Sequence, residues 1–399
     1  MKLDDSNIGT PKLPSFGVPV PVNREVGGGC ILPVDIVLAP EWWHKNEGIT
    51  FDRDFFFHPL KRVEEEQRME KILYERWGKF GLGEHKNSPR PEIGAVHLAA
   101  GFLLSEMMGC QVNYSENHPP QVLPAHKELL NIDTDKVFQS AAFQQVTDLT
   151  DSLKKKYGYL TGDINWGGIL NIAMDLRGEN IFLDMMLTPD EVKTYFSGIA
   201  AVIEKFTSFL LAETGTTSIS VNRGVRHLQK PVLLHSECSH TMISAEDYEN
   251  YLLPFDQKWS KHRPFGIHYC GPDPHRMAAS FAKIPHLDYL DLGWGGDVKI
   301  LREHLPDTFF NIRLSPVEIA RQSHDEIRET IIRLVHDSGN PLLTGVCCIN
   351  MDDSVSDDRI DVIFKTVEEL RKESPLPPDT FLSGQAVPPK GEGLGRCFE

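Results

Sequence analysis

The chain has 399 residues, of which 40% are hydrophobic and 25% are charged, and its formal net charge is −16. The length suits one α/β barrel with extensions, and the composition predicts a globular core. Because the chain is acidic and shows no basic stripe, we expect neither nucleic acid nor an anionic membrane as a partner.

The expected location follows from apolar stretches and cysteine usage. The longest apolar candidate, 199–211, is broken by Glu204 and Lys205, so we expect no membrane-spanning helix. The first residues, 1–5, lack the apolar stretch of a signal peptide. Seven cysteines are odd in number and sparse for this length, which favours a reducing compartment over a disulfide framework. We therefore expect a cytoplasmic protein whose thiols are core residues or metal ligands.

The first part of the chain predicts an arm, two helices and a loop. Residues 1–53 combine scattered prolines, a triple glycine and an aromatic stretch, and are expected to form an irregular N-terminal extension. Apolar residues spaced by threes and fours predict a helix over 59–77, and a second helix is expected over 95–108. The Pro-rich, polar segment 116–136 is expected to be a loop.

The rest of the chain repeats a strand followed by a helix. Ser244 should cap one of these helices, with Asp247 as its capping-box partner, and a helical break is expected near Ser323. Such alternation implies parallel βα units and favours a (β/α)8 TIM barrel over residues 54–375, followed by a tail over 376–399. A doubly wound sheet is the alternative, but no Gly-rich phosphate turn supports it. The expected strands are 231–235, 266–269, 287–291, 309–314 and 342–346, and helices are expected after 244 and over 273–284, 297–305, 316–336 and 356–372.

A histidine and two cysteines stand where predicted strands end. His268 and Cys270 close one strand, and Cys347 closes another. In a barrel, catalytic groups collect at strand ends, and one imidazole with two thiolates suits a catalytic Zn²⁺ that keeps a fourth position open. The alternative is that all three are core residues, because cysteine is among the most often buried types. Cys348 competes with Cys347, since adjacent strand residues face opposite ways.

Carboxylates and histidines at neighbouring strand ends extend this candidate site. Asp291 and Glu237 are placed to supply a fourth ligand or to support one, and helix capping is the alternative for Asp291. Glu237 could also be a general base, while His235 or His240 could donate to a substrate oxygen. A polar loop at a strand end would explain the same cluster.

Two further pairs are candidates for the pocket. Asn165 and Trp166 could line it, although the surrounding Asp, Asn and Gly residues are also typical of a turn. Asn311 and Arg313 alternate on one strand and could face the barrel interior. A buried arginine needs a carboxylate partner, so structural pairing is the alternative for Arg313.

Several of these segments together resemble the uroporphyrinogen decarboxylase superfamily. They are PVLLHSECSHTMISAEDYENYLLP at 231–254 and GIHYCG at 266–271, with upstream similarity over 95–113 and downstream similarity in NIRLSPVEI at 311–319 and TGVCCIN at 344–350. The resemblance covers roughly residues 54 to 372 and rests on the order and spacing of these motifs.

Within that superfamily, the His-x-Cys…Cys set is similar to that of zinc-dependent methyltransferases, of the coenzyme M methyltransferase or O-demethylase type. The resemblance implies zinc held by His268, Cys270 and Cys347, and a corrinoid (cobalamin) carried by a partner protein. The substrate would be a methylated donor or a thiol acceptor, and the long arm and the 116–136 excursion favour a bulkier donor. The alternative is a metal-free decarboxylase, whose Arg-rich N-terminal signature we do not find here. A non-enzymatic barrel with a structural zinc is a third possibility.

Overall fold

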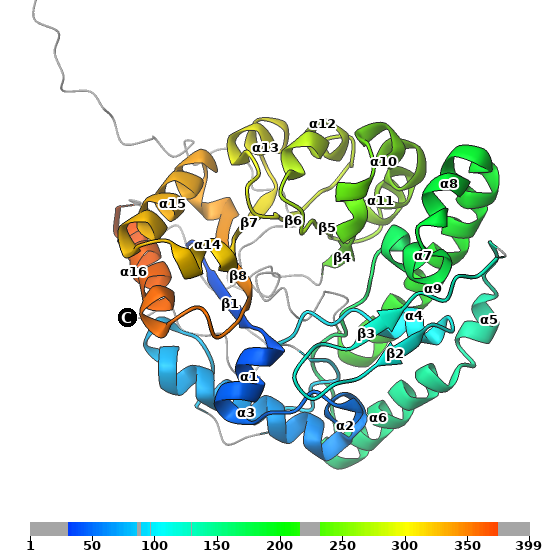
Figure 1. The fold of residues 1–399 in the computed structure, drawn as a ribbon, viewed down its shortest axis with the longest axis horizontal. Coiled ribbons are helices and arrows are strands. Elements are labelled where there is room, and N and C mark those ends of the chain that lie inside the picture. The colour runs from blue at the N-terminus through cyan, green and yellow to red at the C-terminus, as the bar shows by residue number, and fades with distance from the viewer. Residues whose placement is uncertain (1–30, 86–88, 96, 129, 216–231, 374–399) are drawn as a thin grey trace, which may run out of the picture.

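The protein is described by a computed structural model that covers residues 31–85, 89–95, 97–128, 130–215 and 232–373. Within this part of the chain, six parallel strands form one curled sheet in the order β1-β8-β7-β6-β5-β4, with helices on its outer side (Figure 1). This is the expected TIM-barrel-like architecture. The strands are β1 (Val34–Leu38), β4 (Leu233–Ser236), β5 (Phe265–His268), β6 (Tyr289–Asp291), β7 (Phe309–Leu314) and β8 (Thr344–Met351).

Two irregular segments continue the wall beyond β4. The Gly168 amide donates to the Ser236 carbonyl at the end of β4, which places the segment before Gly168 beside that strand. A parallel bridge between Glu92 and Thr161 then places residues 91–95 beside this segment. We infer that these extended pieces take the second and third places of an eight-membered barrel, where regular strands would otherwise stand.

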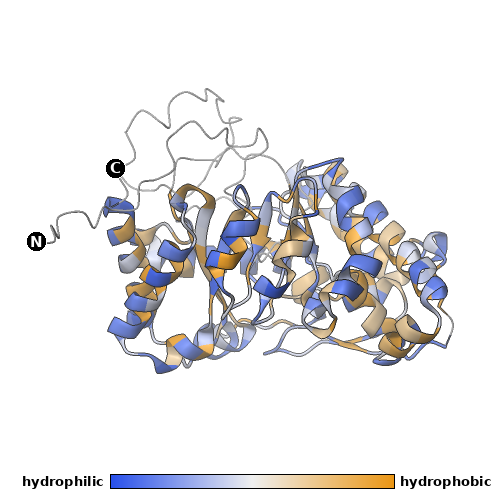
Figure 2. Ribbon diagram, turned by 90° about the horizontal axis from the view of Figure 1, so that it is seen from above, coloured by the Kyte–Doolittle hydropathy of each residue, from blue (hydrophilic) through white to orange (hydrophobic). Residues whose placement is uncertain are grey.

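Helices surround the sheet, and Figure 2 shows that they carry both hydrophilic and hydrophobic residues, as helices with one face on a core do. A small hairpin pairs β2 (Gln111–Asn113) with β3 (Gln121–Leu123). The helices are α1 (Pro40–Glu47), α2 (Arg53–Phe57), α3 (Pro59–Trp77), α4 (Leu103–Met107), α5 (Thr134–Val137), α6 (Ala141–Tyr157), α7 (Ile169–Arg177), α8 (Asn180–Leu187), α9 (Pro189–Thr214), α10 (Ala245–Tyr251), α11 (Leu253–Ser260), α12 (Ala278–Phe281), α13 (Val298–His304), α14 (Pro316–Arg321), α15 (His324–Asp337) and α16 (Asp357–Glu373).

One of these helices, α9, is long and apolar enough to cross a membrane by length and composition. Half of its most apolar window is nevertheless buried inside the fold. Its buried side chains, including Phe196, Ile203 and Phe206, belong to the main hydrophobic core. A core helix of a folded domain passes the same test, so α9 is explained by its packing.

The alternation of side chains along the strands separates two apolar clusters. Val37, Leu234, Tyr289 and Phe309 form a small cluster inside the curled sheet. Residues of opposite parity, such as Ile36, Leu290 and Phe310, join the large core beneath the helices. The same rule turns Cys347 to the inner cluster and Cys348 to the outer core.

Most expected elements of the second half are present. The Ser244–Asp247 capping box is formed, and Ser323 caps α15 after the break that follows α14. The helix over 356–372 is confirmed as α16, and in the first half the helix over 59–77 is confirmed as α3. The helix expected over 273–284 is instead a 3-10 turn, Pro274–Met277, followed by the short α12.

Three expectations for the first half are wrong. The part of the presumed arm that the structure describes is not irregular, because β1 pairs in parallel with β8 and α1 buries Trp42 and Trp43. The strand β1 has five residues and lies in a stretch rich in prolines and glycines, so the local composition did not indicate a strand. The helix expected over 95–108 shrinks to α4, and the 116–136 loop contains β3 and the start of α5. Residues 1–30 and 374–399, with most of the arm and the tail, lie outside the described ranges.

Candidate active site

A cavity of about 440 Å³ lies at the carboxyl ends of the strands. Ser236 and His268 are the last residues of β4 and β5, and both line it. Residues 99–102, 165–167 and the face of α7 that carries Asn171 form the opposite wall. Both the position and the size of the cavity are typical of a barrel enzyme's substrate site.

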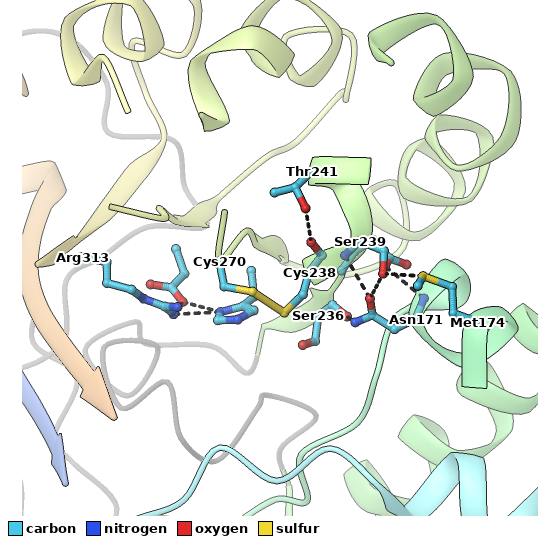
Figure 3. Close-up of a disulfide and its surroundings, with 11 residues drawn as sticks. Asn171, Met174, Ser236, Cys238, Ser239, Thr241, Cys270 and Arg313 are labelled. Atoms are coloured by element: carbon cyan, nitrogen blue, oxygen red, sulfur yellow. Dashed lines mark hydrogen bonds and ion pairs between the residues drawn. A yellow bond between two sulfur atoms is a disulfide. The ribbon is translucent and has the colours of Figure 1, made fainter. Parts of the chain in front are cut away.

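Three potential metal ligands meet at this cavity. The Sγ atoms of Cys238 and Cys270 and a ring nitrogen of His268 all lie within 4.8 Å of one another. The two sulfurs are joined as a disulfide, and Figure 3 shows this bond between Cys238 and Cys270. In the reduced state the same atoms would be one imidazole and two thiolates, a donor set that fits zinc and leaves a fourth position for substrate.

The sheet register explains why the two cysteines meet. Ser236 and His268 are the paired last residues of β4 and β5. Cys238 and Cys270 each stand two positions beyond these strand ends, so they come face to face. Sequence reasoning did not find Cys238 as a ligand. A signal for this pairing was available in the sequence. Cys238 and Cys270 are separated by 32 residues, the same separation as the paired strand residues Ser236 and His268.

Cys347, the second thiolate predicted from the sequence, stands elsewhere. It lies within β8, paired with Asp35 on one side and Arg313 on the other, and its Sγ is 3.7 Å from Asp291 Oδ1. Burial, with Asp291 nearby, raises the pKa of the Cys347 thiol well above its usual value. The structure therefore brings His268 and Cys270 together as predicted, but with Cys238 rather than Cys347 as the nearest second thiol.

Asp291 organises the buried polar groups behind His268. Its Oδ2 contacts His268 Nδ1 and accepts a hydrogen bond from Arg313 Nη2 at 2.5 Å, while Oδ1 accepts one from Asn311 Nδ2 at 3.2 Å. Burial lowers the pKa of His268, and Arg313 adds to this while Asp291 opposes it. Burial alone would lower the pKa of Arg313, but Asp291 and Cys347 raise it above its usual value. With Nδ1 held by Asp291, coordination by His268 would fall to Nε2.

Glu237 and His235 face helix α7 rather than the cavity. The Glu237 carboxylate accepts hydrogen bonds from the amides of Leu170 at 2.7 Å and Asn171 at 3.1 Å, which caps the amino end of α7. Burial raises the pKa of Glu237 to about 7, against the opposing effect of His235. His235 Nδ1 forms a hydrogen bond with Asp256 Oδ1 at 2.7 Å. Its Nε2 accepts a hydrogen bond from the amide at the start of α7.

His240 also lies away from the cavity. Its ring is fully buried, stacks on Tyr269 at 5.6 Å between centroids, and packs edge-on against Tyr248 and Phe281. Among the described residues, neither ring nitrogen has a hydrogen-bond partner. Burial lowers the pKa of His240 well below its usual value, so the ring is neutral.

Asn165, Trp166 and Arg313 line the cavity, as the sequence suggested. Asn165 Nδ2 donates to the Leu98 carbonyl at 2.5 Å, and the Trp166 ring stacks near His235. Asn311 does not line the cavity and acts on Asp291 instead.

The sequence analysis missed polar residues on the other wall. Asn171, Met174 and Asp175 line the cavity from one face of α7, and their spacing of three and four residues was the available signal. Asn350 lines it because of a bulge, since Val37 pairs with Ile349 while Leu38 pairs with Met351. Asn350 has a positive φ of 63°, a conformation that asparagine tolerates, and no sequence signal predicted this bulge.

Comparisons with known proteins agree with this fold. No protein-family model and no curated protein sequence matches the chain. A solved methyltransferase from Methanosarcina mazei superposes with a TM-score of 0.57 at 14% sequence identity, covering 86% of this chain and 94% of that one. At this identity the likeness shows a shared barrel fold.

Two further solved structures are more distant. A B12-independent methionine synthase from Shewanella, in complex with selenomethionine, gives a TM-score of 0.47 at 8% identity, over 86% of this chain and 99% of that one. A putative vitamin-B12-independent methionine synthase from Listeria monocytogenes gives 0.41 at 12% identity, over 79% and 89%. Likeness at this level adds nothing to the argument about the site.

Proposed function

We propose that the chain is a zinc-dependent methyltransferase that exchanges a methyl group between a small substrate and a corrinoid on a partner protein. The observation that carries the proposal is the convergence of Cys238, His268 and Cys270 on a cavity at the strand ends. Barrels with this arrangement perform chemistry at the cavity mouth. The shared fold with a solved methyltransferase supports the reaction class without specifying it.

The residues of the chain have separate parts in such a reaction. Cys238, His268 and Cys270 would hold zinc, which when bound would act as a Lewis acid on the heteroatom that carries or receives the methyl group. Asp291 fixes the ring of His268 through Nδ1. Arg313 in turn balances the Asp291 carboxylate, so that no net charge is left behind the imidazole.

The cavity itself disfavours the decarboxylase alternative. A substrate with several carboxylates needs several cationic groups around it. Among the described residues that line the cavity, Arg313 is the one basic side chain besides His268, and it is already paired with Asp291. The polar contacts on offer, such as Asn165 and Asn171, suit a less charged substrate.

The proposal extends to a partner and a location. We propose a corrinoid protein as the partner, because the zinc methyltransferase resemblance implies a corrinoid that gives or takes the methyl group. We further propose the cytoplasm as the location, since zinc binding requires Cys238 and Cys270 as thiolates and a reducing compartment keeps them so.

Metal analysis joined to an activity assay tests the proposal. The reduced protein should bind zinc. Once loaded with zinc, it should transfer methyl groups between free cobalamin and a methoxylated donor or a thiol, and the absorption spectrum of the cobalamin reports this transfer. His268→Ala and Cys270→Ala should lose zinc and transfer together, because each removes a ligand. Cys348→Ala, which alters a thiol in the outer core, should keep both. Methyl transfer by a folded, zinc-free Cys270→Ala protein would refute the proposal.

A further inference from the structure

The cavity is lined by two charged side chains of opposite sign, and only one of them is balanced. Arg313 is paired with Asp291 at 2.5 Å. Asp175, on α7, accepts a hydrogen bond from the Ser105 hydroxyl at 2.6 Å. Within the described residues, no lysine, arginine or histidine forms an ion pair with Asp175. Burial raises the pKa of Asp175, because a partly buried carboxylate without a counter-charge is costly, and a cationic ligand would supply the missing charge.

The cations of neighbouring segments are engaged elsewhere. The ammonium of Lys127 binds the Met108 carbonyl oxygen at 2.5 Å. The guanidinium of Arg177, one half-turn beyond Asp175, pairs with Asp184 at 2.7 Å. Neither can turn to Asp175 without giving up its present contact.

Two aromatic residues line the cavity together with Asp175. Phe102 and Trp166 line the same cavity, and Met174 precedes Asp175 on α7. Aromatic faces attract alkylated ammonium groups, while a carboxylate supplies the opposite charge. Figure 3 shows Asn171 and Met174 on the other side of the two sulfurs from Arg313. Asp175 follows Met174 on α7 and lines the same cavity.

We propose that this cavity takes a ligand with a positively charged nitrogen, an alkylammonium or quaternary ammonium group, which sits against Asp175. The rest of the ligand extends toward His268 and the two thiols. The identification of this ligand as the methyl donor or acceptor rests on the proposed function, whereas its binding requires only the cavity and Asp175.

Calorimetric titration of the reduced, full-length protein with choline and with its uncharged carbon isostere, 3,3-dimethyl-1-butanol, tests the proposal, both with and without added zinc. The two probes have the same shape and differ in charge. Choline should bind at least about tenfold more tightly, the scale expected for a contact with a charged group. Equal affinities, or no binding of choline, would overturn the proposal.

Two substitutions distinguish charge from shape. Asp175→Asn should remove the preference for choline while leaving the weak binding of the isostere unchanged. Ser105→Ala removes the hydroxyl that donates to Asp175 and opposes the rise of its pKa, so it should weaken the preference without removing it, because the carboxyl group remains. Asp148→Asn, on the exposed side of α6, is the matched control and should behave as the wild type. Choline binding that survives Asp175→Asn would refute the role of this carboxylate.

The zinc measurements separate this proposal from the proposed function. A protein that prefers choline through Asp175 but binds no zinc would retain the ammonium site and lose the methyltransferase assignment. A protein that binds zinc and transfers methyl groups but does not distinguish the two probes would retain the methyltransferase assignment and lose the ammonium site.

Discussion

The two sides of the barrel differ in how they position side chains. On the strand side, formed by β1 and β4–β8, the register of a parallel sheet places His268, Asp291 and Arg313 on neighbouring strands. The loop side is formed by residues 97–102, 161–168 and helix α7. Individual hydrogen bonds hold its backbone: Asn165 donates to the Leu98 carbonyl, and the Glu237 carboxylate accepts from the Leu170 amide. The comparison teaches that the strand side supplies the reactive groups, while the loop side shapes the space in front of them.

The largest expected effect decides where the metal lies on the strand side. Cys238→Ala should abolish zinc binding by the reduced protein, whereas Cys347→Ala should leave it intact, because among the cysteines that the structure describes only Cys238 lies within reach of His268 and Cys270. Zinc content measured by mass spectrometry after dialysis gives the answer, with Cys348→Ala as the control. Loss of zinc in Cys347→Ala together with its retention in Cys238→Ala would restore the ligand set predicted from the sequence.

The junction of the two sides should be the next most sensitive point. A Cβ added at Gly168 would meet the Ser236 carbonyl oxygen at 2.6 Å and the Glu237 carboxylate. Gly168→Ala should therefore lower the free energy of unfolding by about 1–3 kcal/mol, the cost of overpacking. Urea unfolding measures this effect.

Gly167→Ala is the matched control for that experiment. A Cβ at Gly167 would meet its nearest neighbour, Asn171 Cβ, at an ordinary 3.4 Å, so the substitution should change stability little. Equal unfolding midpoints for the two variants would show that the loop side is not held tightly against β4.

A smaller effect is expected from the carboxylate behind the metal site. Asp291→Asn should keep zinc binding but weaken its affinity about 10- to 100-fold, because an amide orients the His268 ring less well than a carboxylate. Competition with a chelating dye measures the affinity, and Asp307→Asn, which does not line the cavity, serves as control. An unchanged zinc affinity would show that Asp291 does not support a metal bound by His268.

The smallest effect should come from a feature that belongs to neither wall. Ser244 and Asp247 form the capping box of α10, on the outside of the sheet. Ser244→Ala should cost about 1 kcal/mol of stability, as the loss of a helix cap usually does. The zinc content should be unchanged. A thermal melt measures the stability, and metal analysis measures the zinc content. A change in zinc content would mean that the outer helices control the site more closely than the structure indicates.

The strand side was also the more predictable one. Period-two alternation and helix caps located β4–β8 and the break at Ser323, since each signal depends on residues close together in sequence. On the loop side, the apolar residues at helical spacing did not locate the helix correctly, because the described residues 97–101 form a turn and irregular backbone and α4 begins only at Leu103. The bridge between Glu92 and Thr161 is a tertiary contact that local spacing does not predict.

The sequence by itself determined the barrel, the strand ends that carry His268 and Cys270, and the opposite directions of Cys347 and Cys348, because alternation and capping are local properties of the chain. Only the tertiary structure decided which cysteine faces His268. That choice depends on the relative register of β4 and β5, which sets Cys238 opposite Cys270, and a register between strands 32 residues apart is a property of the folded sheet.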